Sequence, residues 1–167
     1  MASELSIPKL QRGYDTNLAA EFFVLSSLHR LGLTANLTLG NKKGVDIVVV
    51  RDAGDAVTVE VKGLAGMTSW PLNRIPDPKS NHFFVFVCYL GTIRDPTSCP
   101  EVYVVPSTDL ARFIYKAPVG RSFVQLRSIR KTGAAYLHAW KLIEHAISIA
   151  GAGAPRKRRP ASSLVGL

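Results

Sequence analysis

The segment that decides the fold spans residues 44–63 and reads GVDIVVVRDAGDAVTVEVKG. Both ends are rich in β-branched residues, which favour strands. They are separated by a three-residue loop that ends in Gly54, and hairpin loops of this length commonly need a left-handed residue at their last position. The segment therefore predicts a β-hairpin in which Arg51 faces Asp55.

The polar side chains of this hairpin gather on one face. In the second strand Thr58, Glu60 and Lys62 alternate with valines, and successive strand residues point to opposite faces. The predicted pairing places Asp46 directly opposite Glu60. Opposed Cβ atoms lie about 4.5–5.5 Å apart, where like charges are destabilising. A divalent cation offsets that repulsion, because Mg²⁺ is commonly held by one or two carboxylates.

Lys62 points to the same side as Glu60, where it can hold a hydroxide or a phosphate oxygen near the cation. A metal ion lowers the pKa of a bound water and stabilises a phosphoryl transition state. Asp46, Glu60 and Lys62 are therefore a set suited to cleaving a phosphodiester bond. A simpler interpretation stays open, in which Glu60 and Lys62 form a solvated sheet face whose lysine neutralises the acid, and Asp46 ends a turn. A shift of pairing by one residue would separate the two acids.

The rest of residues 1–150 predicts one α/β domain with a mixed central sheet flanked by helices on both faces. Residues 64–81 hold three prolines and are expected to form a loop, and residues 123–129 a strand or an extended connection. Helices are expected at residues 15–31 and 134–149, with a short one capped by Ser107 or Thr108 and ending at residue 115. Strands are expected at residues 33–39, 45–51, 56–63, 82–90 and 101–105.

The composition is that of a basic globular protein. Of 167 residues 47% are hydrophobic, and the formal net charge is +9. Four positive charges lie in residues 156–159, within a tail of residues 151–167 that we expect to be disordered; without them, 17 basic residues face 12 acidic ones. A basic body favours a nucleic-acid partner. Neither a membrane span nor a secretory signal is apparent, so we expect a cytoplasmic protein.

The hairpin residues also resemble a known nuclease family. The run GVDI at residues 44–47, followed by VEVKG at residues 59–63, is similar to the motif of the PD-(D/E)xK superfamily, which has the restriction-endonuclease-like fold and includes Holliday-junction resolvases and restriction nucleases. The resemblance covers residues 15–90. Gly44 and Val45 stand where the motif has its proline, and prolines obscure the helix that this family has after its third strand.

This resemblance implies an α-β-β-β-α-β core and a Mg²⁺- or Mn²⁺-dependent endonuclease. Asp46 and Glu60 match the metal ligands, Lys62 matches the catalytic lysine, and the backbone carbonyl of Val61 completes the coordination. In many members an acid on the first helix joins the metal site, and Glu21 is the candidate; it is otherwise an exposed helix acid. The resemblance also implies DNA rather than RNA as the substrate, and small members often work as homodimers.

Further residues are candidates for contacting nucleic acid. Lys42 and Lys43 precede Asp46 and are either phosphate contacts or part of a solvated turn. Trp70 and Arg74 follow Lys62 in the chain, where Trp70 either stacks on a base or packs under its own loop. The four histidines show no spacing typical of a metal site.

Two other functions remain compatible with these residues. The fold can serve as a non-catalytic nucleic-acid-binding or scaffold protein, although such a protein has no need for opposed acids. The chain can also be an unrelated α/β protein in which the motif is coincidental. Metal binding that depends on Asp46 separates a nuclease from both.

Overall fold

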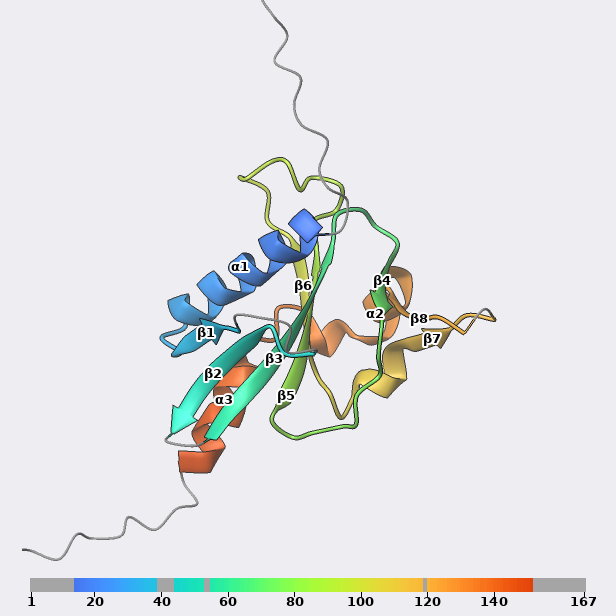
Figure 1. The fold of residues 1–167 in the computed structure, drawn as a ribbon. Coiled ribbons are helices and arrows are strands. Elements are labelled where there is room, and N and C mark those ends of the chain that lie inside the picture. The colour runs from blue at the N-terminus through green and yellow to red at the C-terminus, as the bar shows by residue number, and fades with distance from the viewer. Residues whose placement is uncertain (1–13, 39–43, 53–54, 119, 152–167) are drawn as a thin grey trace, which may run out of the picture.

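The computed structural model describes residues 14–38, 44–52, 55–118 and 120–151 (Figure 1). The predicted residues Lys42 and Lys43 and the basic tail lie outside the described residues. The elements are α1 (Tyr14–Arg30), β1 (Ala35–Leu37), β2 (Ile47–Asp52), β3 (Asp55–Leu64), β4 (Ser69–Leu72), β5 (His82–Cys88), β6 (Glu101–Pro106), the 3-10 helix η1 (Leu110–Phe113), β7 (Ile114–Lys116), β8 (Ser122–Gln125), α2 (Leu126–Thr132), the 3-10 helix η2 (Ala134–Tyr136) and α3 (Lys141–Gly151).

The strands form two sheets. The larger one has five strands in the order β1-β2-β3-β5-β6. Strands β3 and β5 pair in parallel, and the other neighbours pair antiparallel. The smaller sheet has three antiparallel strands in the order β4-β8-β7. This mixed central sheet confirms the predicted α/β fold class.

The hairpin of β2 and β3 has the predicted pairing along most of its length. Ile47 pairs with Val59 and Val50 with Ala56, but the register then shifts, so that Asp52 pairs with Asp55. The prediction that Arg51 faces Asp55 directly is therefore wrong. The Arg51 guanidinium instead reaches sideways, to the Asp55 carboxylate and, at 2.7 Å, to the Ala146 carbonyl of α3.

The two faces of the larger sheet are covered differently. On one face Val57, Val59 and Val61 of β3 share a core with α1 and α3. On the other face Phe84 and Phe86 of β5 pack against the smaller sheet and α2. Helices therefore lie on both faces, as predicted, and the second face gains a sheet that the sequence did not reveal.

The prediction of a loop over residues 64–81 is wrong at β4. Trp70 and Leu72 of that strand are buried, whereas Pro71 between them is exposed. The absent amide proton of Pro71 is tolerated because β4 is an edge strand of its sheet. The family's helix between the third and fourth core strands is absent from residues 65–81, which the structure describes in full.

The C-terminal half also differs from prediction in its details. The helix expected at residues 134–149 is broken because His138 adopts a positive φ of 48°, so α3 begins at Lys141. Ser107 does not cap η1; its hydroxyl donates to the Lys79 carbonyl at 2.8 Å. Residues 123–129 divide between β8 and α2. No helix in the described part of the chain is long and apolar enough to cross a bilayer.

Candidate active site

Asp46 lies immediately before β2, where its carboxylate is fixed against β3. Its Oδ2 accepts a hydrogen bond of 2.6 Å from the Val61 amide, and its own amide donates to the Val59 carbonyl at 2.9 Å. The N–H and C=O of a strand residue point toward the same neighbour. The Val61 carbonyl therefore faces the side on which Asp46 lies, as its predicted role as a metal ligand requires.

Glu60 and Lys62 form an ion pair on the opposite face of β3 from the core valines. The Glu60 Oε1 and Lys62 Nζ atoms are 2.8 Å apart. Glu60 is only 8% exposed, which is unusual because carboxylates are rarely this buried unless they are paired or bind a metal. The sheet face is therefore not solvated at Glu60, but Lys62 does pair with the acid, as the simpler interpretation also expects.

The acids of the site influence one another electrostatically. Burial raises the pKa of Asp46, and the negative charge of Glu60 raises it further, whereas the Val61 hydrogen bond and Lys62 act in the opposite direction. Burial also raises the pKa of Glu21, followed by the charge of Asp46, with Lys62 again opposing the shift. Three acids and one lysine thus lie within reach of one another's charge.

Glu21 reaches the site because α1 docks closely on β3. A Cβ atom added to Gly63 would lie 2.6 Å from the Thr16 carbonyl oxygen, so only glycine permits this approach. The Asn17 side chain accepts a hydrogen bond of 3.2 Å from the Gly63 amide. Residues four apart share a helix face, so Glu21 follows Asn17 on the side of α1 that meets β3. The half-buried Glu21 is not the exposed helix acid of the alternative interpretation.

The donor set suits a hard divalent cation. Carboxylate and carbonyl oxygens are the ligands that Mg²⁺ and Mn²⁺ prefer, and Mg²⁺ usually keeps several waters. Among the described residues, no three acidic, histidine or cysteine side chains form a cluster that could hold an ion alone. The PD-(D/E)xK resemblance names two of these acids, Asp46 and Glu60, with the Val61 carbonyl as the ligands of such a cation, which would leave its remaining positions to water.

His82 is a member of the site that the sequence did not reveal. It begins β5 directly beside Thr58, and its Nδ1 lies 2.8 Å from the Thr58 hydroxyl. Burial lowers the pKa of His82, while the charge of Glu60 acts in the opposite direction. The imidazole is therefore largely neutral at neutral pH. The signal that could have found it is the parallel pairing of β3 with β5, which no local pattern encodes.

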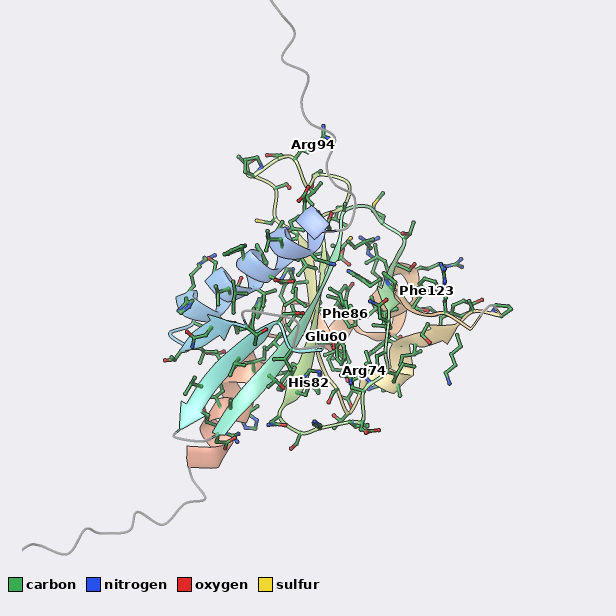
Figure 2. All side chains as sticks on the ribbon, viewed as in Figure 1. Glu60, Arg74, His82, Phe86, Arg94 and Phe123 are labelled. Carbon is green, nitrogen blue, oxygen red and sulfur yellow. The ribbon has the colours of Figure 1, made fainter. Side chains whose placement is uncertain are left out.

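A pocket of about 350 Å³ is lined by Gly44, Arg74 and His82, and by Asp77 and Lys79. A Cβ atom added to Gly44 would lie 2.7 Å from an Arg74 guanidinium nitrogen and 3.3 Å from the Glu60 Oε2 atom. Arg74 therefore approaches the acidic cluster of Asp46 and Glu60. Figure 2 shows Arg74 with Glu60 and His82 in one region of the molecule.

The prediction that Trp70 stacks on a base is wrong. Its exposed fraction is 0%, its ring packs 5.3 Å from that of Phe86, and its indole N–H donates to the Val87 carbonyl at 3.2 Å. A side chain without accessible surface cannot contact a nucleotide. Trp70 instead joins the smaller sheet to the larger one.

Comparisons with known proteins agree with this architecture. No family model matches the chain, and no curated protein is similar to it in sequence. Among solved structures, the fold is similar to that of the bacterial homing endonuclease I-Ssp6803I, with a TM-score of 0.54 and 17% sequence identity over 84% of this chain and 98% of that one. The chain therefore has a nuclease-like mixed α/β fold.

Proposed function

We propose that this chain is a metal-dependent nuclease that hydrolyses phosphodiester bonds, with DNA as its substrate. The observation that carries the proposal is the Asp46 carboxylate, which is held on the Val61 amide beside the buried pair of Glu60 and Lys62. Burial and a neighbouring acid raise the pKa of both Asp46 and Glu21, and perturbed pKa values of this kind are typical of functional sites. The fold it shares with an endonuclease supports the same conclusion.

The residues take the roles that the PD-(D/E)xK resemblance implies. Asp46, Glu60 and the Val61 carbonyl hold Mg²⁺ or Mn²⁺, and Glu21 assists from α1. When bound, the cation lowers the pKa of a coordinated water and offsets charge on the phosphoryl group. Lys62 holds the attacking oxygen or a phosphate oxygen through its ammonium group.

The raised pKa values of Asp46 and Glu21 make cation binding depend on pH. The pKa of each group is raised chiefly because burial disfavours the charged form, and a neighbouring acid adds to the shift. Since a carboxylate must be deprotonated to bind a metal, affinity and cleavage should rise with pH through the range in which these groups ionise. Lys62 partly offsets the shift and helps to keep the site competent at neutral pH.

The direct test is cleavage of labelled DNA and RNA duplexes, flaps, junctions and single strands in Mg²⁺ or Mn²⁺. We expect the wild type to cut DNA, and Asp46→Ala and Lys62→Ala to reduce the rate by at least about 10³-fold. Asp95→Asn is the matched control, because Asp95 is exposed and its contacts with Thr97 lie within its own loop.

Metal titration distinguishes a nuclease from a non-catalytic binding protein. Calorimetry should show Mn²⁺ binding by the wild type that Asp46→Ala abolishes. If the protein binds nucleic acid equally well in EDTA but leaves every substrate whole in both metals, the chain is a binding protein and the proposal fails.

A further inference from the structure

The segment from residue 110 to residue 143 carries an unbalanced charge. It contains seven basic residues and no acidic one. These residues build η1, β7, β8, α2 and η2 and begin α3. Three of the seven, Lys116, Arg121 and Arg127, lie on or beside β7 and β8 and are exposed. Arg130 is paired with Glu101, so the positive charge of this side of the smaller sheet rests on Lys116, Arg121 and Arg127.

The outer face of the smaller sheet carries aromatic side chains. Trp70 and Val124 are buried against the larger sheet, so their neighbours in each strand point outward. Pairing places Phe123 between Pro71 and Tyr115, and Tyr115 is 47% exposed. These three residues form an apolar row across the sheet.

A second pocket joins this face to the candidate active site. It has a volume of about 530 Å³ and is lined by Arg74 and Ile75 on one side and by Arg121 and Phe123 on the other. Among the described residues that line it, none is acidic. Arg74 also lines the smaller pocket, together with Asp77, so the two pockets share one cationic side chain.

The charge of this surface and its connection to the acidic cluster through Arg74 together indicate that a nucleic acid binds there. A phosphodiester at the acidic cluster belongs to a chain whose next phosphates must lie along the protein surface. Arg74 and Arg121 present guanidinium groups, which bind phosphate well, and Phe123 presents an aromatic ring for a sugar or base. Figure 2 shows Arg74 below Glu60 and Phe123 in the view drawn, nearer to Glu60.

We propose that the pocket between Arg74 and Arg121, together with the outer face of β4, β8 and β7, binds the backbone of the nucleic acid and directs it to the acidic cluster. This inference rests on the proposed function, because it assigns the path of the same substrate. Arg121 and Phe123 are binding residues and take no part in the chemical step.

The test is binding of a fluorescein-labelled 20-base-pair DNA duplex and of its single strand, measured by fluorescence anisotropy in EDTA at several salt concentrations. Arg121→Ala should weaken binding about 3- to 10-fold and lower the slope of log affinity against log salt by about 0.9, the value for one lost phosphate contact. Phe123→Leu should weaken binding about 5-fold with an unchanged slope. Arg121→Lys should restore the slope.

Arg94→Ala is the matched control, because Arg94 is exposed and lies at the other end of the molecule from Arg74 (Figure 2). It should leave affinity and slope unchanged. Thermal melting of each variant excludes unfolding of the smaller sheet as the cause of a loss. If Arg121→Ala and Phe123→Leu bind like Arg94→Ala, the inference is overturned.

Cleavage in Mg²⁺ separates this inference from the proposed function. A wild type that cuts DNA while Arg121→Ala and Phe123→Leu bind and cut normally would remove the binding path and leave the nuclease. A wild type that binds DNA through Arg121 but cuts nothing would remove the proposed nuclease activity and leave the binding path. A wild type that neither binds nor cuts any of these DNAs would overturn both.

Discussion

Asp46 experiences opposing influences that a metal ion would resolve. Its hydrogen bond from Val61 favours the charged carboxylate, whereas burial and Glu60 disfavour it and together raise its pKa. The folded protein therefore binds a proton at Asp46 more tightly than the unfolded chain does. It follows that the stability contributed by this group falls as pH rises through the range between the unfolded and folded pKa values.

We therefore expect Asp46→Asn to stabilise the metal-free protein while abolishing cleavage. The amide keeps an oxygen to accept the Val61 hydrogen bond and removes the buried charge. In EDTA at pH 8 the melting temperature should rise by about 1–4 °C, corresponding to up to about 1 kcal/mol. The difference should shrink toward pH 4, where the wild-type carboxyl becomes protonated.

The control is Asp95→Asn. Hydrogen bonds from Thr97 lower the pKa of Asp95, so the folded state favours its charged form. The melting temperature of Asp95→Asn should not rise above that of the wild type at pH 8. An Asp46→Asn protein that melts below the wild type at every pH would show that the carboxylate is not repelled in the folded state.

Lys62 should set the pH at which the site accepts a cation. Its charge lowers the pKa of both Asp46 and Glu21, so Lys62→Met should move the onset of Mn²⁺ binding to higher pH. Calorimetric affinities at pH 6 should fall several-fold more than those at pH 8. Lys62→Arg should keep the wild-type profile, and equal losses at both pH values would contradict this role.

At the scale of elements, the contact between α1 and β3 places Glu21 at the site. It depends on Gly63, where an added Cβ atom would meet the Thr16 backbone. Gly63→Ala should therefore destabilise the protein by about 1–3 kcal/mol, seen as a lower urea midpoint, and weaken metal binding. Gly66→Ala is the control, since nothing lies within 4 Å of a Cβ there. Equal midpoints for the two variants would rule out a tight contact.

Elements that depend on local sequence were predictable, and those that depend on distant packing were not. The β2–β3 pairing follows from its valines and short loop, and with it the shared face of Glu60 and Lys62. Asp46 lies just before β2, so its pairing with Glu60 stays a prediction. Strand β4 could not be predicted, because Pro71 suggests a loop until its edge position in the second sheet is known. The break at His138 likewise follows from a distant contact, since its amide donates to the Val102 carbonyl of β6 at 2.8 Å.

At the scale of the whole molecule, the basic net charge hides a separation of charges. The sequence holds 34 consecutive residues, 110–143, that lack any acid, but only the fold shows that they supply β7 and β8 of the smaller sheet. Meanwhile Asp46 lies at the start of β2 within reach of the charge of Glu60 on β3, and Glu21 of α1 lies within reach of the charge of Asp46. Only the topology brings the acidic cluster and the basic surface next to each other, through Arg74.

A cation that relieves this acidic cluster should stabilise the entire fold. A ligand that binds only the native state adds RT ln(1 + [L]/Kd), or about 1.4 kcal/mol at ten times Kd, which for a domain of this size raises the melting temperature by roughly 3–6 °C. We expect that rise for the wild type when Mg²⁺ or Mn²⁺ replaces EDTA at pH 8, with NaCl added to equalise ionic strength. Asp46→Asn should have a higher melting temperature than the wild type in EDTA, and the metal should not raise it further. If both proteins gain equally, the cation acts elsewhere on the chain and Asp46 is not its ligand.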